Sequence, residues 1–506
     1  MLLRRLRALL VGVVAAASLA VPLVVFAQQT LPYKVPANAA PAVRLTVADS
    51  SLAAGFPAYA DAVPVINYHD VSARQGVYST TPETFATQLA ALRAAGFESV
   101  SLSTVEGLVS GRPVDLPRRP ILITFDDAVS SQYVNADAAL ARYGFRAVAF
   151  LPTAFVAERT PSYYLTRGEI RQLAATGRWE FGSHTDSGHH LVRTGPGTAG
   201  PWLTNLERRP DGSMESLDAW TGRVRGDLAL SVTRLRQLTG ETPAALAYPF
   251  SAAAFPTNDP QLPPLLESVV AETFPVAFTA SLSTPSAVTA DSPRYRLPRL
   301  EVTADMSATD LLQRLAVMVP RPPSADPRLW SVTSAPGCSV VGGAVVVAAS
   351  RYTICRPAAT GRDWQDYTAT VAVAGLGPAA TGIVTVRNGD DAWAEVAVSD
   401  RRYVLRQRVW GRWRVLATGA VPRSAVGGRH VLTLDLAGRV LRVRIDHVAL
   451  APVTLESALA RGALGVAVAP KGTRTVTFTP LSVVPHASAP APAPEPAPSP
   501  VSRPRR

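Results

Sequence analysis

Cysteine is nearly absent from this chain of 506 residues, which contains only Cys338 and Cys355. An even cysteine count would predict one disulfide between them if the chain is exported, which the N-terminal segment described below leads us to expect. Closing a loop of this size contributes about 3 kcal/mol to stability when the geometry allows it. The same scarcity disfavours a cytosolic metal site or redox motif built from cysteines.

Lysine is also scarce, since only Lys34 and Lys471 occur, and arginine therefore supplies nearly all of the formal net charge of +12. A coding bias toward G and C would produce the same excess of arginine. The charge alone is therefore weak grounds for a nucleic-acid partner, and we expect none. Residues 331–485 hold 18 Lys and Arg against 9 Asp and Glu, an excess of 9, so the basic character belongs mostly to the C-terminal half.

A positively charged and then apolar segment occupies residues 1–27. Arg4, Arg5 and Arg7 precede an apolar run over residues 8–27 that ends at a small-residue site, as in export signals. The run is longer than the usual ~7 to 15 residues, so a cleaved signal peptide and an uncleaved membrane anchor both stay open. We therefore expect a secreted or cell-envelope protein, with a membrane partner only if the segment is uncleaved.

The length of the chain predicts two globular domains with tails, because domains of ~100 to 200 residues are the rule. A proline-rich break, "PRPPSADPR", separates two halves of different pattern, and a Pro-rich stretch ends the chain. The predicted parts are a signal peptide or anchor (1–27), a linker (28–60), a first domain (61–305), a linker (306–328), a second domain (329–485) and a Pro-rich tail (486–506).

Short apolar runs alternate with helical patterns through the first domain. One pattern, "TPETFATQLAALRAAGF", has Pro82 in its first turn, apolar residues on one face and Gly96 as its stop. The apolar runs are continuous, as parallel strands covered on both faces require, and predict an α/β domain with a barrel-like parallel sheet. The expected strands are "VPVINY", "FESVSL", "ILITF", "RAVAFL", "WEFGS", "ALAYPF" and "PVAFTA".

The second domain has a different pattern. Its strand-length segments, such as "YTATVAVAGL" and "HVLTLDLAG", alternate polar with apolar residues and are separated by Gly, Asp and Asn turns. This pattern predicts an all-β domain, and a sandwich in particular. The only helical signal in this half is a weak one near "LESALARG".

Four predicted strands of the first domain end at residues capable of chemistry. "VINYH" ends at His69, "LITF" is followed by Asp126 and Asp127, "WEFGSH" ends at His184, and "AYPF" ends at a proline-restricted turn. In a parallel barrel the C-terminal strand ends share one face, where such folds carry their sites. We therefore expect these side chains to converge.

A further histidine, His189, follows His184 in "FGSHTDSGHHL". This spacing would put the two about 140° apart on a helix, but the glycines and serines indicate a loop, which can bring both imidazoles to one cation. One carboxylate with two imidazoles leaves open positions suited to catalytic Zn²⁺. The same ligand set describes a non-haem Fe(II) oxygenase site, but a distant carboxylate beside a second Asp favours hydrolysis.

Each motif alone also has an unremarkable interpretation. The histidine loop is also readable as a polar surface loop, and "FDD" as a carboxylate capping the helix that follows. His69 alone is also readable as a core histidine with satisfied hydrogen bonds. Their joint occurrence at strand ends favours a shared site over all three.

These motifs resemble those of the polysaccharide deacetylases, the NodB-homology domain of carbohydrate esterase family 4. "TFDDA" is similar to the first motif of the family, "SHTDSGH" to the second and "AYPF" to the third. "NYHDV", ahead of "FDD", resembles the branch of poly-β-1,6-N-acetylglucosamine N-deacetylases, whose domain is circularly permuted. The resemblance covers about residues 61–305 and implies a distorted (β/α) barrel of NodB type.

The resemblance also implies a role for each site residue. Asp126 would be the general base, and His69 the general acid. Asp127, His184 and His189 would bind Zn²⁺ or another divalent metal.

Further roles follow from the third motif and its surroundings. The backbone N–H of Phe250, where the family carries Tyr, would bind the oxyanion. Arg299 in "YRLPRLEV" is a candidate for tuning the base, and is equally readable as a surface arginine. Ala128 departs from the family pattern, which has Gly, and alanine tolerates positive φ poorly if the turn requires it.

The sequence therefore predicts an exported, metal-dependent hydrolase that removes N-acetyl groups from a polysaccharide containing N-acetylhexosamine. Amide hydrolysis needs an activated water, a stabilised oxyanion and a proton for the leaving amine, and the residues above supply each. Two alternatives stay open: an inactive deacetylase fold that binds carbohydrate, and a deacetylase of O-acetyl groups or of peptidoglycan.

The second domain has one notable segment, "RRYVLRQRVWGRWRVL", in which arginines surround Tyr403, Trp410 and Trp413. One interpretation is a basic and aromatic surface that binds a glycan or cell-wall polymer. The favoured one is a β-hairpin turning at "WGRW", with arginines facing solvent and aromatics partly in the core. The domain is similar to laminin-G/concanavalin-like sandwiches, which often bind glycans.

Overall fold

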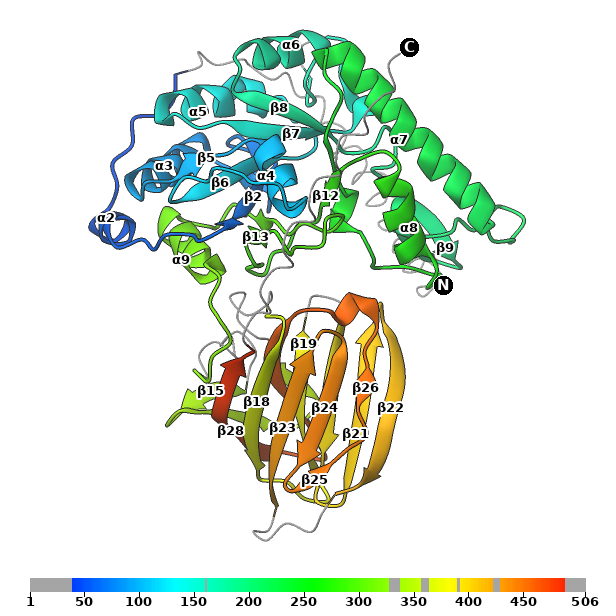
Figure 1. Ribbon diagram of the computed structural model, residues 1–506. Coiled ribbons are helices and arrows are strands. Elements are labelled where there is room, and N and C mark those ends of the chain that lie inside the picture. Colours follow the sequence, from blue (N-terminus) through cyan, green and yellow to red (C-terminus); the bar gives the residue numbers. More distant parts are fainter. Residues whose placement is uncertain are drawn as a thin grey trace, which may run out of the picture.

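The chain forms two domains, one lying beneath the other in the computed structural model (Figure 1). The first is α/β and the second is built almost entirely of strands. The predicted signal or anchor (1–27), the start of the first linker and nearly all of the Pro-rich tail lie outside the described residues. The structure describes residues 39–159, 162–326, 337–355, 364–388, 392–421 and 428–486.

The α/β domain is built on a parallel sheet that curls into a barrel. Parallel bridges between Phe278 and Leu297 and between Ser281 and Leu300 join its two ends. Each expected strand of this domain is present, so the predicted barrel is confirmed. Along the sheet the strands are β12 (Val276–Phe278), β11 (Ala245–Ala247), β8 (Trp179–Ser183), β7 (Ala147–Leu151), β6 (Pro120–Phe125), β2 (Val65–Tyr68) and β14 (Leu300–Glu301), with β5 (Glu98–Ser99) paired to β6.

Several helices between the strands begin at residues whose side chains cap them. The helices are α2 (Val47–Ala54), α3 (Pro82–Ala94), α4 (Leu102–Val109), α5 (Asp137–Tyr143), α6 (Arg167–Ala175), α7 (Leu217–Thr239), α8 (Leu262–Ala271) and α9 (Ala308–Met318), with a π-helix η1 (Gln132–Ala136) and 3₁₀ turns η2 (Thr153–Phe155), η3 (Trp202–Thr204) and η4 (Pro249–Ser251). At the start of α3, the Thr81 side chain, just before Pro82, accepts a hydrogen bond from the Thr84 N–H. At the start of α6, Thr166 and Glu169 form a capping box. Helices α5 and α8, in contrast, have no side-chain cap.

Short strand pairs lie outside the barrel. They are β1 (Ala62–Val63) with β13 (Val288–Thr289), β3 (Asp70–Val71) with β4 (Ser79–Thr80), and β9 (Leu191–Gly195) with β10 (Thr198–Pro201).

Both linkers flanking the first domain were predicted too long. Within the segment 28–60, α2 is folded, and Asp49 accepts a hydrogen bond of 2.6 Å from Thr309 at the start of α9. Within the segment 306–328, α9 buries Leu311 and Leu315 in the domain core. The reason is visible in the sequence, because Ser307 and Asp310 form a capping box ahead of an amphipathic run.

The second domain consists of two antiparallel sheets around a shared apolar core, as predicted. The weak helix expected near "LESALARG" is only a 3₁₀ turn, η7 (Ser457–Leu459). One sheet holds β15 (Cys338–Val341), β16 (Ala344–Ala349), β28 (Arg474–Pro485), β18 (Tyr367–Ala374), β23 (Arg429–Ala437), β24 (Val440–Ile445), β25 (Val448–Ala449) and β26 (Val453–Thr454). The other holds β17 (Thr353–Cys355), β27 (Ala463–Pro470), β19 (Ala380–Asn388), β20 (Ala392–Val398), β21 (Arg402–Val409) and β22 (Arg412–Ala420).

The predicted disulfide between Cys338 and Cys355 is present, with a Cα–Cα distance of 5.9 Å. Cys338 begins β15 in one sheet and Cys355 ends β17 in the other. The bond therefore links the two sheets of the sandwich at one edge.

The hairpin predicted at "WGRW" is also present, as β21 and β22 joined through Trp410 and Gly411. The guanidinium of Arg406 lies 4.1 Å from the Trp413 ring centroid and pairs with the fully buried Glu395. The guanidinium of Arg408 lies over Trp393 in the same way, at 4.8 Å. These arginines are therefore held by partners within the hairpin sheet, which favours the structural interpretation of this segment.

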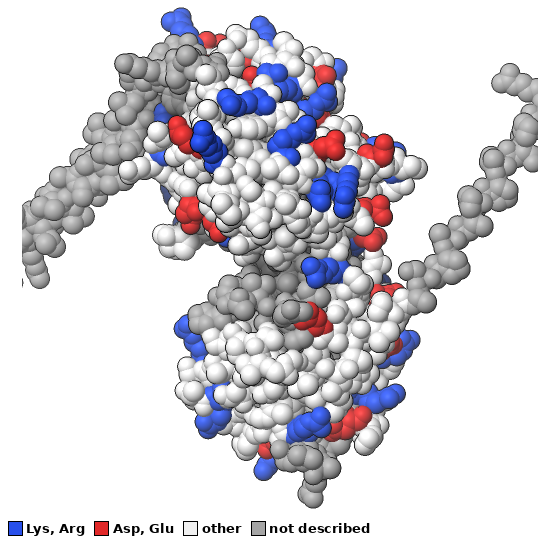
Figure 2. Space-filling view, turned by 90° about the vertical axis from the view of Figure 1, so that its left-hand side faces the viewer, with Lys and Arg blue, Asp and Glu red and all other residues white. Residues whose placement is uncertain are grey.

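The surface carries charges of both signs. Figure 2 shows the face that lies on the left-hand side of Figure 1. On this face of both domains, Lys and Arg are interspersed with Asp and Glu rather than gathered into one patch. Among the residues that the structure describes, no helix has the length and apolar character needed to cross a membrane.

Candidate metal centre

The C-terminal ends of three barrel strands bring the predicted site residues together. β2 ends at Tyr68 just before His69, β6 ends just before Asp126 and Asp127, and β8 ends just before His184. Strands β2, β6, β7 and β8 are parallel neighbours, so these ends lie on one face of the barrel. The predicted convergence is therefore what the structure shows.

Three of these side chains form a candidate metal site. Asp127 Oδ1 lies 3.4 Å from His184 Nε2 and 3.2 Å from His189 Nε2. The ligand atoms of the three residues lie within 4.8 Å of one another, a spacing that allows all of them to contact one ion. Burial raises the pKa of Asp127, but the imidazoles of His184, His189 and His69 outweigh it, and the pKa lies well below its ordinary value.

The hydrogen bonding of His184 shows that these residues fit a cation. His184 Nδ1 lies 2.8 Å from the carbonyl oxygen of Ala247. A carbonyl only accepts, so Nδ1 carries the proton and Nε2 presents a lone pair. That lone pair faces Asp127 Oδ1, another acceptor, which is buried without a hydrogen-bond partner among the described residues. Two acceptor atoms that face each other repel unless a positive charge lies between them. Two imidazoles and one carboxylate are a ligand set that suits a divalent metal.

The loop carrying His189 is held by α7. Asp227 on α7 accepts from the backbone N–H groups of Asp186 and Ser187, each at 2.8 Å, and from Ser187 Oγ at 2.9 Å. A side chain at Gly188 would meet the ring of Trp202 at 2.8 Å, so this position requires glycine. The loop expected from the glycines and serines is therefore fixed, and its anchor is a carboxylate far away in the sequence.

Asp126 is held in a buried ion pair with Arg299. Nη1 and Nη2 of Arg299 donate to the two carboxylate oxygens, each at 2.8 Å, and Arg299 is fully buried. The surface interpretation of Arg299 is therefore wrong. Asn67 donates a third hydrogen bond at 3.1 Å. A carboxylate accepts about four, so one acceptor position of Asp126 stays free.

Burial raises the pKa of Asp126, but the charge and hydrogen bonds of Arg299, together with the charge of His69, outweigh burial and lower the pKa below its ordinary value. Asp126 is therefore ionised at neutral pH, as a proton acceptor must be. Neither Asp126 nor Asp127 caps the helical segment that follows, because η1 begins after Ser131 without a side-chain cap.

His69 lies on the opposite side of Asp127. Its Nε2 is 3.9 Å from Asp127 Oδ2, and its Nδ1 is 3.0 Å from Glu301 Oε1. Burial lowers the pKa of His69, but the contact with Glu301 and the charges of Asp127, Glu301 and Asp126 raise it to about 9. The imidazole therefore carries a proton at neutral pH and can donate it. The Tyr78 ring stacks on it, with 4.8 Å between centroids.

Phe250 and Ala128 both have left-handed backbone conformations. Phe250 has φ 57° and its ring lies 4.6 Å from that of His189, so the third motif lies beside the candidate metal ligands. Ala128 has φ 53°, the conformation that glycine adopts most readily. Its side chain is fully buried among core residues, so the methyl group packs into the core. The substitution for glycine therefore costs backbone strain and does not fill the site.

Two residues of the site escaped sequence reasoning. Asn67 contacts both Asp126 and Glu301, and Glu301 contacts His69. Each had a weak signal, because a polar residue interrupts an otherwise apolar strand in "VINY" and in "RLEV". Their pairing spans 234 positions, which no local pattern reveals.

A family model described as polysaccharide deacetylase matches residues 114–259. This match includes Asp126, Asp127, His184, His189 and Phe250, and it confirms the resemblance drawn from the motifs. His69 and Arg299 lie outside the matched range, on either side of it.

Curated relatives include the poly-beta-1,6-N-acetyl-D-glucosamine N-deacetylase of Staphylococcus epidermidis, which is 25% identical over 234 residues. That alignment covers 46% of this chain and 71% of the relative. The protein of the same name from Staphylococcus aureus (strain MRSA252) is 24% identical over 230 residues, covering 45% of this chain and 69% of the relative.

Solved structures similar to this chain include the BpsB deacetylase domain from Bordetella bronchiseptica. It has a TM-score of 0.41 and 24% identity, and the match covers 49% of this chain and 97% of that one. IcaB from Ammonifex degensii has a TM-score of 0.39 and 22% identity, covering 52% of this chain and 98% of that one.

Proposed function

We propose that this chain is an exported, metal-dependent hydrolase that removes N-acetyl groups from polysaccharide containing N-acetylglucosamine, and that the region matched by the polysaccharide deacetylase model belongs to its catalytic domain. The observation that carries the proposal is the pair of adjacent aspartates with separate partners. Asp127 faces two imidazoles, and Asp126 is held by Arg299. Such a division of roles is what metal-assisted amide hydrolysis needs.

We propose that Asp127, His184 and His189 hold Zn²⁺ or another divalent metal. A metal bound there would supply a Lewis acid and lower the pKa of a water molecule. Asp126, with its free acceptor position, would take up the proton of the attacking water. Arg299 keeps this carboxylate ionised and fixes its orientation.

The leaving amine needs a proton, and His69 is the proposed donor. Its raised pKa keeps it protonated at neutral pH, and Glu301 orients the ring through Nδ1. The backbone N–H of Phe250 is the proposed oxyanion donor. The ring of Phe250 contacts that of His189, a proposed metal ligand, so this residue lies beside the proposed site. Each step of amide hydrolysis thus has a residue of this chain assigned to it.

We propose an extracytoplasmic location, secreted or in the cell envelope, on the basis of the basic and then apolar residues 1–27. The substrate follows from the names of the curated relatives, which act on poly-beta-1,6-N-acetyl-D-glucosamine. The sandwich domain is proposed to hold a glycan or cell-wall polymer beside the catalytic domain.

The test is acetate release from poly-β-1,6-N-acetylglucosamine by the protein from residue 28 onward. It is measured after chelation and again after addition of Zn²⁺, with Asp127→Ala assayed alongside. We expect release that requires metal and a loss of at least about 100-fold in the variant, which lacks a metal ligand.

Parallel assays on chitin, peptidoglycan fragments and O-acetylated glycans separate the alternatives. Faster release from an O-acetyl ester or from peptidoglycan would replace the proposed substrate. No release from any of them by folded, metal-loaded protein would leave the inactive, carbohydrate-binding fold as the better hypothesis.

A further inference from the structure

A cavity of about 980 Å³ lies between the two domains, and both contribute to its walls. This volume is at the upper end of the ~300 to 1,000 Å³ of ordinary ligand pockets. Figure 1 shows the sandwich beneath the α/β domain. Residues of both domains line the cavity. Hydroxyl, aromatic and guanidinium groups all face it, among them Ser251, Ser281, Tyr295, Arg296, Trp410 and Arg461.

Two residues of the cavity wall are linked directly to residues at the candidate metal centre. Ser251 lines the cavity and directly follows Phe250, whose ring contacts that of His189. Thr279 also lines it, and its carbonyl oxygen accepts from Arg299 Nε at 3.0 Å. These segments follow the C-terminal ends of β11 and β12, on the face of the barrel that carries the site. A polymer in the site would therefore have the cavity next to it.

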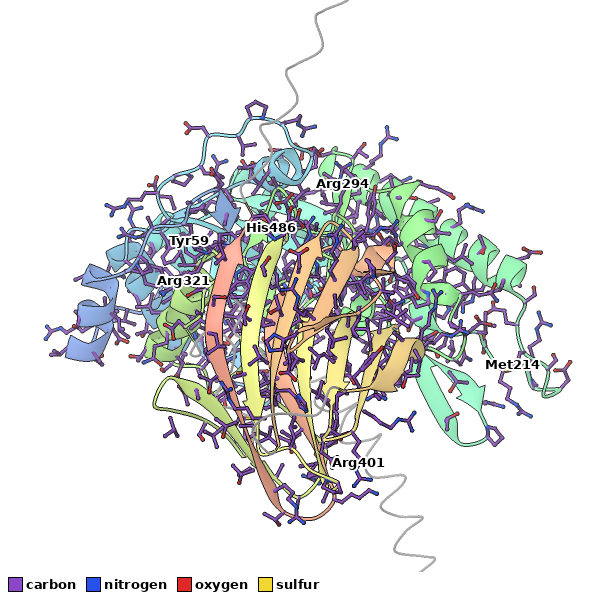
Figure 3. All side chains as sticks on the ribbon, turned by 60° about the horizontal axis from the view of Figure 1, so that its bottom comes forward. Tyr59, Met214, Arg294, Arg321, Arg401 and His486 are labelled. Carbon is purple, nitrogen blue, oxygen red and sulfur yellow. A yellow bond between two sulfur atoms is a disulfide. The ribbon has the colours of Figure 1, made fainter. Side chains whose placement is uncertain are left out.

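The sandwich contributes the tip of one hairpin. Figure 3 shows Arg401, at the start of β21, at the far end of the sandwich, so β21 runs toward the first domain and ends beside Trp410. A Cβ atom at Gly411 would lie 3.1 Å from the Phe255 ring, and the guanidinium of Arg296 lies 5.6 Å from the Trp410 ring centroid. The hairpin tip therefore contacts the α/β domain directly.

The conformation of Trp410 is unusual for a bulky residue. Trp410 and Gly411 form a two-residue turn with φ of 46° and 77°, a geometry for which Asn-Gly is the common sequence. A large side chain with positive φ is an outlier that the local backbone disfavours. Such strain persists where the side chain has a use, and here the indole lines the cavity.

Two donors at the cavity wall lack acceptors. Trp410 Nε1 and Arg461 Nη1 are buried and have no hydrogen-bond partner among the described residues. A buried donor without a partner costs free energy, and both nitrogens are shielded from solvent, so a ligand that brings acceptors would bind favourably where a shift of these side chains exposes the donors. Aromatic rings, hydroxyls and unsatisfied donors together suit a sugar ring, which offers an apolar C–H face, hydroxyl groups and, in an N-acetylated unit, a carbonyl oxygen.

We propose that this cavity is a subsite for an N-acetylated hexosamine unit of the polymer, adjoining the unit that is being deacetylated. The proposal rests on the proposed function and adds a specificity element that the sandwich supplies. Glu267 also lines the cavity and pairs with Arg296, so Arg461 supplies the excess positive charge at the wall, and the subsite favours a neutral acetamido group over the ammonium group of a deacetylated unit.

The test is binding of a β-1,6-linked N-acetylglucosamine pentamer to the Asp127→Ala protein, measured by isothermal titration calorimetry without turnover. Trp410→Asn removes the indole and gives the turn its preferred residue, so the hairpin is expected to fold. We expect it to weaken binding by about tenfold, the effect of losing one aromatic anchor. Trp413→Ala is the matched control, because Trp413 lies on the same hairpin outside the cavity wall and is expected to leave affinity unchanged.

Arg461→Met, which keeps the side-chain stem, is the second variant and is expected to weaken binding in the same way. The fully deacetylated pentamer is expected to bind the Asp127→Ala parent and its Trp410→Asn derivative equally weakly. Equal affinity of Trp410→Asn and its parent for the acetylated pentamer would overturn the subsite, as would equal affinity of the parent for both pentamers. Because binding is measured without acetate release, failure of the deacetylase activity would not be mistaken for failure of the subsite.

Discussion

Among single residues, Arg299 is expected to have a large effect on stability, because it is the counter-charge of the buried carboxylate of Asp126, the proposed general base. Removing one member of a buried ion pair leaves the other without compensation and costs about 3 to 5 kcal/mol. We expect Arg299→Met to lower the free energy of unfolding by that amount and to abolish most acetate release. Urea unfolding followed by circular dichroism measures the first effect.

Arg296→Met is the matched control for stability. Arg296 pairs with Glu267 at 2.8 Å, but both side chains are partly exposed, so solvent screens the pair. We expect a loss below about 1 kcal/mol. Equal losses for the two arginine variants would show that the pair with Asp126 contributes no more to folding than a surface contact.

Sequence reasoning was most successful at this scale where a residue directly follows a strand. Continuous apolar runs indicate parallel strands, and the C-terminal ends of parallel strands converge. This reasoning located His69, Asp126, Asp127 and His184. Arg299 remained open between two interpretations, because nothing in "YRLPRLEV" indicates which arginine turns inward. Only the approach of β14 to β2 settles it, by bringing Arg299 beside Asp126.

At the scale of elements, the contact between α7 and the histidine loop decides how firmly a metal is held. Asp227 accepts from two backbone N–H groups of that loop, and an asparagine has only one acceptor oxygen to replace two. We expect Asp227→Asn to weaken Zn²⁺ binding by about 10- to 100-fold, as outer residues of metal sites commonly do. Competition with a chelating dye measures this affinity.

Asp218→Asn is the control, since Asp218 is an exposed carboxylate in the first turn of the same helix. It should leave metal affinity unchanged. If Asp227→Asn bound metal as tightly as Asp218→Asn, the loop would be fixed by its metal ligands alone.

The elements that sequence reasoning placed wrongly are those at the edges of the first domain. Proline-rich neighbours led to the interpretation of 28–60 and 306–328 as linkers, although α2 and α9 each begin with a capping box. Local helix signals were therefore present, but the burial that makes these helices part of the domain comes from their packing on each other and on α3. Strand β14 has only two residues, too few for any periodicity to mark it.

At the scale of the whole molecule, the two domains have separate cores and only one contains a disulfide. Replacing both cysteines by serine releases a loop with a sequence separation of 17, which costs about 3 kcal/mol. We expect the sandwich to melt at a lower temperature and the α/β domain at its original one. Differential scanning calorimetry separates the two transitions.

Acetate release at 25 °C should survive this double substitution, because the metal centre lies entirely in the other domain. A downward shift of both transitions by the same amount would instead show that the domains unfold as one cooperative unit.

The closure of the barrel also determines at what point in chain synthesis the proposed active site becomes complete. His69 stands near the beginning of the first domain and Glu301 at its end, and Asn67 hydrogen-bonds to Glu301 across 234 positions. The Asp127, His184 and His189 ligands are all translated well before Arg299 and Glu301. A nascent chain could therefore gather its proposed metal ligands while it still lacks Arg299 and Glu301, the partners of Asp126 and His69. Hydrolysis of the substrate would begin only once the last strand, β14, has docked and the domain is complete.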